Sequence, residues 1–162
     1  MRRILTIILC SLLLAACGIK TMPWMNGTYK GEVSDDKPDG YGVWTGKDQQ
    51  RDSGFWVAGK QNGNGTYVWK NNTYRGGFKD GNFSGFGELT IGDSIAYSGQ
   101  WKNGKRQGKG HITDSSHRPV EGVWNADTLV SGRRIDSTGV YEGQLSRQCE
   151  AQGHGSFTAV DG

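Results

Sequence analysis

The stretch from Tyr97 to Gly110, YSGQWKNGKRQGKG, decides the fold of this chain. It is the best-preserved copy of a pattern in which Tyr, Gly and Trp stand two residues apart and further glycines follow at fixed places. The separations between successive copies are 21 to 23 residues, a period typical of stacked repeat units rather than of a conventional globular core. Marked by their first glycine, the copies begin at Gly31, Gly54, Gly76, Gly99, Gly122 and Gly143.

The pattern resembles the MORN repeat, whose consensus has the same Tyr-Gly-Trp-Gly-Gly-Gly spacing. The resemblance runs from about Gly27 to the end of the chain and is strongest in the third and fourth copies. The second copy has Asp52 at the Tyr position, and the fifth has Ser131 and Arg133 where the paired glycines belong. The sixth has Gly153 one residue late. The resemblance implies about six repeats of about 23 residues in an open, twisted sheet that acts in scaffolding and membrane association.

Each copy predicts a β-hairpin. Side chains alternate along a strand, so Tyr97, Gly99 and Trp101 lie on one face, and the later glycines belong to a second strand. We predict that Trp101 faces Gly108 and that Gly99 faces Gly110, so that the ring lies against a glycine of its own hairpin. The same register places Trp56, Phe78 and Leu145 opposite Gly63, Gly85 and Gly153. The fold class is therefore all-β, an elongated single-layer antiparallel hairpin meander of about twelve short strands. A closed β-barrel or sandwich is the alternative.

Residues 1–16 are predicted to form a lipoprotein signal peptide. Arg2 and Arg3 precede an apolar run over residues 4–14, which is shorter than the about 20 residues that span a bilayer. Residues 14–17, LAAC, are similar to the lipobox of bacterial lipoproteins. That resemblance implies cleavage before Cys17, diacylglycerol on its sulfur and acylation of the new amine. No cofactor other than this covalent lipid is expected.

The signal also predicts where the protein resides. Cys17 is followed by Gly18, whereas an Asp at that position signals retention at the inner membrane of Gram-negative bacteria. We therefore expect a lipid-anchored protein of the cell envelope, at the outer membrane if the organism has two. Residues 17–26 are expected to be the lipidated Cys and a short tether, in which residues 18–25 span at most about 28 Å, and residues 27–162 the repeat domain.

Composition and charge exclude other classes of function. The formal net charge of +3, from 19 basic and 16 acidic residues, falls to about +1 once Arg2 and Arg3 are removed. This balance does not favour nucleic-acid binding. Cys10 leaves with the signal and Cys17 carries lipid, so Cys149 is the single thiol of the mature chain. It is expected in a loop, the alternative being a disulfide between two copies.

Catalytic and metal sites are not expected. His111, His117 and Asp114 stand close together with two serines, but the grouping has no nucleophile elbow and is better interpreted as turn sequence. The acidic loop at residues 35–40 lacks the spacing of a calcium loop, and no cluster of Cys and His favours another metal. The sequence thus predicts that the protein is not an enzyme.

The leading hypothesis is a non-catalytic protein-interaction or scaffolding module. A single-layer sheet cannot bury both faces, so part of its aromatic surface should remain for a protein partner or a second copy. Packing within the sheet is the main role expected of these rings. The candidate interaction face consists of Tyr29, Trp56, Tyr74, Phe78, Tyr97, Trp101 and Trp124.

The alternative hypothesis is binding of lipid headgroups or envelope glycans. Basic side chains cluster on the fourth hairpin and could meet the phosphates of phospholipids or lipopolysaccharide, although a solvated loop edge is the simpler interpretation. The candidate headgroup contacts are Lys102, Lys105, Arg106 and Lys109.

Overall fold

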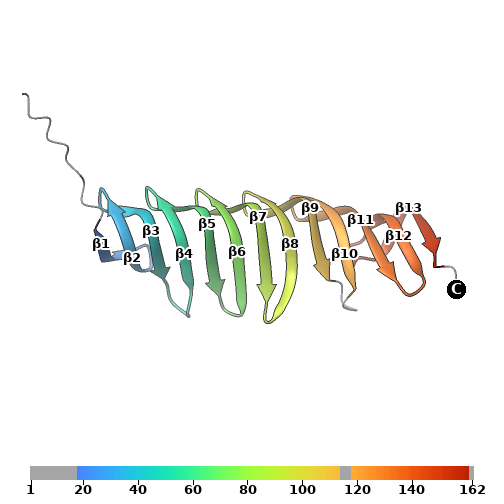
Figure 1. Ribbon diagram of the computed structural model, residues 1–162, viewed down its shortest axis with the longest axis horizontal. Helices are drawn as coiled ribbons and strands as arrows, with labels where there is room; N and C mark the ends of the chain where they lie inside the picture. The colour runs from blue at the N-terminus through green and yellow to red at the C-terminus, as the bar shows by residue number, and fades with distance from the viewer. Residues whose placement is uncertain (1–17, 114–117, 161–162) are drawn as a thin grey trace, which may run out of the picture.

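The computed structural model describes residues 18–113 and 118–160, which form one open antiparallel sheet (Figure 1). Its 13 strands pair in sequence order, with β1 and β13 at opposite ends, so the all-β hairpin meander is confirmed and a closed barrel is excluded. The strands are β1 (Ile19–Trp24), β2 (Gly27–Ser34), β3 (Lys37–Thr45), β4 (Arg51–Val57), β5 (Lys60–Trp69), β6 (Asn72–Lys79), β7 (Asn82–Ile91), β8 (Ser94–Lys102), β9 (Lys105–Thr113), β10 (Pro119–Asn125), β11 (Thr128–Asp136), β12 (Gly139–Leu145) and β13 (Ala151–Ala159).

Strand β1 lies in the segment that was expected to be a tether. It pairs with β2 along its whole length, so the tether prediction is wrong for residues 19–24. The indole nitrogen of Trp44 donates a hydrogen bond to the Trp24 carbonyl at 2.9 Å. Pro23 has no N–H, which is tolerated because β1 is an edge strand. The sheet therefore begins two residues after Cys17, which itself lies outside the described residues.

The predicted pairing of glycines across each hairpin is confirmed. In the fourth hairpin, β8–β9, Gly99 pairs with Gly110. The same pairing holds in four other hairpins, as Gly31–Gly42, Gly54–Gly65, Gly76–Gly87 and Gly143–Gly155. With no side chains at these positions, the paired strands leave a flat strip across the middle of each hairpin.

The predicted pairing beside the loop is wrong. Trp101 pairs with Arg106 in its own hairpin, and Gly108 pairs with Trp124 of the next one. The shift arises from a bulge, because residue 100 of β8 lies opposite residues 107–109 of β9. Gly108 occupies the bulge with a φ of 68°, a left-handed conformation that glycine adopts readily. Trp101 does pair with a glycine, but that glycine is Gly85 of the preceding hairpin, and the indole nitrogen donates to the Gly87 carbonyl at 3.1 Å.

Equivalent shifts occur along the sheet. Phe78 pairs with Phe83, Trp56 with Gln61, and Leu145 with Ala151, where facing glycines had been predicted. Bulged strands bend, and Figure 1 shows the strands turning over at the upper edge of the sheet. The sheet is consequently a trough rather than a plane.

The fifth hairpin, β10–β11, corrects a second expectation. Gly122 pairs with Gly132, the residue before Arg133, and Arg133 itself pairs with Glu121. The paired glycine is therefore present. The hairpin differs because β11 carries no glycine at positive φ, and the register between Val123 and Trp124 shifts by a single residue.

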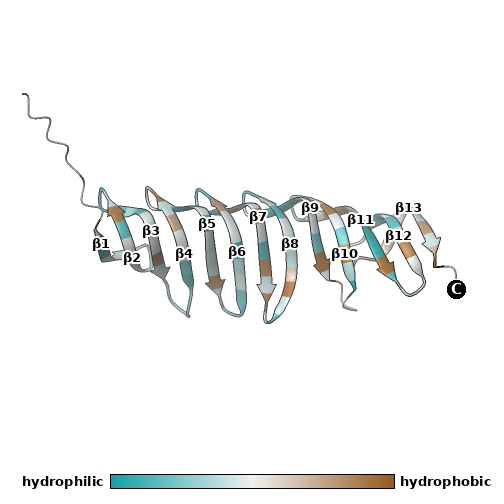
Figure 2. Cartoon of the chain, in the orientation of Figure 1, coloured by the Kyte–Doolittle hydropathy of each residue, from teal (hydrophilic) through white to brown (hydrophobic). Residues whose placement is uncertain are grey.

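The core of this single layer consists of rings on the inner face of the trough. Figure 2 shows hydrophobic positions alternating with polar ones along the strands, as expected when one face is buried. The buried residues fall into two clusters rather than one. The larger extends from Tyr74 to Cys149, the smaller contains Tyr29, Trp44 and Trp56, and the partly buried Tyr67 packs against both.

Candidate functional site

The seven rings predicted to form an interaction face are buried. All are less than 9% exposed, so they form the core of the sheet rather than an open interaction face. They pack edge to face along the trough, for example Tyr74 against Trp101 at 5.4 Å and Tyr97 against Trp124 at 5.1 Å between ring centroids. Such pairs contribute about 0.5–1.5 kcal/mol beyond their burial. The packing role is therefore the one that the structure supports.

Each well-kept copy uses its tyrosine in the same way. In the third hairpin, β6–β7, the Tyr74 ring lies over the Gly76–Gly87 pair, and its hydroxyl donates to the Gly77 carbonyl at 3.0 Å. A Cβ on Gly87 would lie 2.2 Å from that hydroxyl oxygen, which explains why glycine is required there. Burial raises the pKa of Tyr74 to about 12, so the hydroxyl remains a donor at physiological pH.

The second hairpin, β4–β5, departs from this arrangement. Asp52 stands at the tyrosine position, and the Gln61 side chain fills the space over the glycine pair. The Gln61 amide nitrogen donates to the Ser53 carbonyl at 3.1 Å. A polar pair thus replaces a ring, which interrupts the edge-to-face packing and separates the two core clusters.

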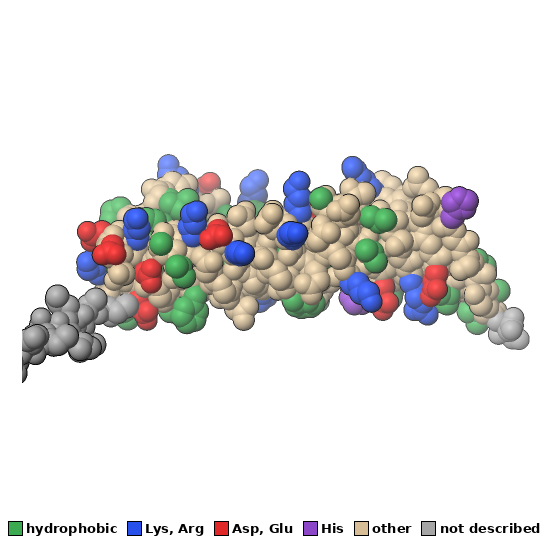
Figure 3. Space-filling view, turned by 90° about the horizontal axis from the view of Figure 1, so that it is seen from above, with side chains coloured by type: hydrophobic (Ala, Val, Ile, Leu, Met, Phe, Trp, Pro, Cys, Tyr) green, Lys and Arg blue, Asp and Glu red, His purple; other side chains and the backbone are tan. Residues whose placement is uncertain are grey.

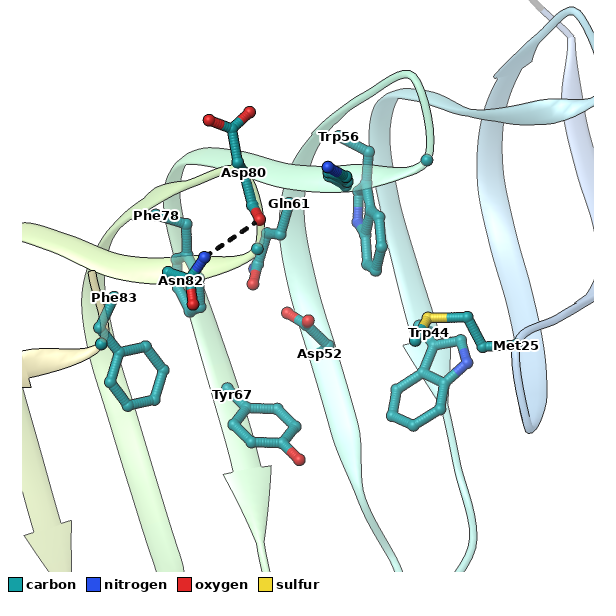
Figure 4. Close-up of a pocket in the computed structure, with 14 residues that line it drawn as sticks. Met25, Trp44, Asp52, Trp56, Gln61, Tyr67, Phe78, Asp80, Asn82 and Phe83 are labelled. Atoms are coloured by element: carbon teal, nitrogen blue, oxygen red, sulfur yellow. Dashed lines mark hydrogen bonds between the residues drawn. The ribbon is translucent and has the colours of Figure 1, made fainter.

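A pocket of about 580 Å³ opens above this polar pair. Figure 4 shows Asp52 near its centre, with Tyr67 and Phe83 on one side and Trp44 and Trp56 on the other. Tyr67 and Phe83 are only partly buried, so their ring surfaces border the pocket. Five aromatic side chains line the pocket, and Asp52 and Gln61 supply polar groups at its base. This combination is typical of small ligand or side-chain binding sites.

Burial dominates the electrostatics of the pocket. It raises the pKa of Asp52 from 3.8 to about 7, and the interaction with the Gln61 side chain, which lowers the pKa, only partly opposes the shift. The pKa of Tyr67 is also raised, first by burial and second by the negative charge of Asp52. The carboxyl group therefore changes its charge near neutral pH, which makes the pocket a candidate functional site.

The sequence pointed to this site only in part. Asp52 stood out as the departure from the repeat, but nothing in the spacing indicated that Gln61 would fill the gap. Tyr67 and Phe83 were not singled out either, because they lie outside the Tyr-Gly-Trp pattern. The signal that could have found the site is the loss of the ring at one position between intact copies.

The four basic residues do not act as one free cluster. Arg106 is half-buried and pairs with Asp127, with 3.2 Å between the guanidinium nitrogen and the carboxylate oxygen. Lys102 and Lys105 are exposed at the turn, whereas Lys109 lies further along β9, opposite Val123. Figure 3 shows Lys and Arg side chains spread along the molecule with acidic ones among them. Headgroup binding at this hairpin stays a prediction.

His111, His154 and Cys149 lie away from the pocket. His111 approaches Glu121 at 3.4 Å, and His117 and Asp114 lie outside the described residues. Cys149 is buried in the larger core cluster, not exposed at the surface. Among residues 18–113 and 118–160, no group of His, Cys, Asp and Glu has the arrangement of a metal site. That same part of the chain contains no helix long and apolar enough to cross a bilayer.

Comparison with known proteins identifies the repeats. The family model of the MORN repeat matches residues 29–51, 53–73, 74–94 and 97–117, just over half of the chain. The prediction of six sequence repeats is therefore corrected to four. Hairpins β10–β11 and β12–β13 continue the sheet without keeping the pattern, since Val120 and Leu145 replace a Tyr and a Trp. No curated protein gives a significant match. The matched repeats suggest a module that binds proteins or membranes.

Proposed function

The chain belongs to the MORN-repeat family, and from that premise we propose that it is a non-catalytic binding module of a bacterial cell envelope. A lipid on Cys17 holds it at the membrane, and the inner face of its trough docks a protein partner. The observation that carries the proposal is the aromatic pocket between the second and third hairpins, because it leaves ring surface accessible on an otherwise closed core. Buried core rings surrounding an accessible pocket favour recognition of a protruding side chain.

The position of β1 supports close anchoring. Only Gly18 stands between Cys17 and the start of the sheet at Ile19, a span of about 7 Å when extended. Lipid on Cys17 would therefore keep the N-terminal end of the sheet at the bilayer surface, and two or three acyl chains make such anchoring stable. With Gly18 after the lipidated residue, delivery to the outer membrane is the expected destination in a Gram-negative cell.

The test of the anchor is incorporation of labelled palmitate in cells. We expect the wild-type chain to be labelled and to remain with the membrane fraction. The variant Cys17→Ser should lose the label and leave that fraction. Labelling that persists in the variant would show that another residue carries the lipid.

The test of docking is photo-crosslinking in intact cells. A photoreactive residue at Lys60, an exposed residue lining the pocket, should capture a protein, whereas one at Phe86, exposed on the outer face, should not. Capture from Phe86 alone would contradict docking in the trough. Capture of a second copy of the chain from Lys60 would change the proposed partner to self-association.

A further inference from the structure

Two hydrogen-bond acceptors are buried at the base of the pocket. Within the described residues, Asp52 Oδ1 and Gln61 Oε1 have no hydrogen-bond partner. Gln61 is only 2% exposed, so bulk water does not reach most of its side chain. Figure 4 shows the ends of the two side chains directed toward one another. A buried acceptor without a donor costs about 1–3 kcal/mol, so a donor that reaches both would bind favourably.

The walls of the pocket favour a donor that carries positive charge. The faces of Trp and Tyr rings attract cations, and Trp44, Trp56 and Tyr67 all border the space around Asp52. An ionised Asp52 adds a negative charge in surroundings that screen it poorly. Apolar ring surface above a carboxylate also suits a group with a hydrocarbon stem and a cationic end.

We infer that this pocket binds the basic side chain, Lys or Arg, of a protein partner. Its N–H groups donate to Asp52 and Gln61, and its methylene stem lies between the rings of Tyr67 and Trp44. The inference rests on the proposed function, which supplies a protein partner, and it specifies what that partner presents.

Other occupants fit these groups less well. An apolar side chain would leave both acceptors unpaired, and an acidic one would face Asp52 and the rim carboxylate of Asp80. The ethanolamine headgroup of a lipid has only two carbons between its ammonium and its phosphate. With the ammonium at Asp52, that phosphate would lie among the rings and toward Asp80.

The experiment is an NMR titration of the full chain in detergent micelles with capped single amino acids. The probes are N-acetyl-lysine methylamide and N-acetyl-arginine methylamide. N-acetyl-norleucine methylamide is the control, since it has the lysine stem without the ammonium. We expect the two basic probes to shift the side-chain resonances of Gln61 and Tyr67, and norleucine to leave them unchanged. Equal shifts with norleucine would overturn the inference, because the pocket would then recognise the stem alone.

Matched variants locate the interaction. Asp52→Asn keeps the shape and removes the carboxylate, so affinity for the basic probes should fall about tenfold or more. Asp80→Asn removes the same charge from the exposed rim and should change affinity less than about twofold. If Asp52→Asn fails to fold, Asp52→Glu replaces it and should retain binding. An unchanged affinity in Asp52→Asn, or a loss equal to that of Asp80→Asn, would contradict the assignment.

Two further readings separate this inference from the proposed function. Vesicles containing phosphatidylethanolamine, tested in competition, should not displace the lysine probe; displacement would mean that the site takes a lipid amine instead. In cells, Asp52→Asn should weaken crosslinking from Lys60. Crosslinking that persists at full strength would leave the docking proposal standing and remove the basic side chain from it. Probe binding without any crosslinked protein would support the basic-side-chain site and contradict the proposal that the trough docks a protein.

Discussion

The second and third hairpins have the same backbone arrangement, but the side chains that cover their inner faces are polar in one and aromatic in the other. Both pair glycines at the centre, Gly54–Gly65 in one and Gly76–Gly87 in the other. The third covers its pair with the Tyr74 ring, which also stacks on Phe83 at 3.7 Å between ring centroids. The second covers its pair with an amide and a carboxyl group. One hairpin therefore continues the core, and the other opens a pocket.

This difference teaches that the repeat has a structural part and a replaceable part. The paired glycines and the bulge fix the strand register whichever side chain lies above them. The side chains above the glycines decide whether the trough is filled locally. A protein that departs from its own local rule at one place, while keeping it on both sides, marks that place as a functional candidate.

The largest effect should come from removing a ring of the intact copy. Tyr74→Ala is expected to lower the free energy of unfolding by about 3–5 kcal/mol, because it deletes a buried aromatic and its packing. Tyr41→Ala, a ring exposed on the outer face, is the control and should cost about 0.5 kcal/mol or less. Urea denaturation measures both. Similar losses would mean that the two faces contribute equally, against the inner-core assignment.

The next effect should come from converting the second hairpin into the third. The double variant Asp52→Tyr with Gln61→Phe places in β4–β5 the residue types found at Tyr74 and Phe83. We expect unfolding to become about 2 kcal/mol less favourable, since a ring joins the two core clusters. Binding of the lysine probe should disappear at the same time. A variant less stable than the wild type would show that the second hairpin cannot accept the ring, and that the two interiors are not interchangeable.

The pH dependence of stability should differ between the wild type and Asp52→Asn. The pKa of Asp52 is about 7 in the folded state and 3.8 as its ordinary value, so the folded chain holds this proton more tightly. Its contribution to stability is complete below pH 3.8 and is lost as the pH rises through about 7. Lys60 and Asp80 at the rim and Tyr67 in the wall are the other titratable groups of the pocket.

In Asp52→Asn this loss should be absent. The variant should unfold at a higher urea concentration than the wild type at pH 8, by a free energy of about 2 kcal/mol, and differ little from it at pH 4. Chemical denaturation at the two pH values measures the change. If the free energy of unfolding changed equally in the two proteins between pH 4 and pH 8, Asp52 would be ionised and well solvated throughout this pH range.

The smallest effect should come from the bulge of the third hairpin. Gly85 has a φ of 72°, and a Cβ there would meet no atom within 4 Å. Gly85→Ala should therefore cost only the conformational term, about 1 kcal/mol. Gly85→Asn should cost less, because Asn tolerates the left-handed region. Thermal denaturation of the pair measures the difference. If both variants lost the same stability, and more than about 1 kcal/mol, crowding rather than backbone conformation would require the glycine.

Much of the fold could be predicted because its signals are local. The period, the strand alternation and the paired glycines follow from positions within one copy, and they yielded the all-β meander. The predicted pairing of Trp101 with Gly108 was wrong because a bulge in β9 shifts the register. Trp101 pairs with Arg106 instead, and Gly108 pairs with Trp124 of the next hairpin. The strand at Ile19–Trp24 was missed because it carries no repeat pattern and exists through pairing with β2.

By itself, the sequence determined the repeat, the fold class and the place where the repeat departs from its own rule, at Asp52. These depend on residue types and spacing alone. Only the tertiary structure decided that the seven rings of the candidate interaction face are buried, because burial arises from the bend that the bulges impose on the sheet. It also decided that Gln61, Tyr67 and Phe83 meet Asp52. The four residues reach the pocket from three strands, Asp52 from β4, Gln61 and Tyr67 from β5 and Phe83 from β7, and their proximity is a property of the folded trough.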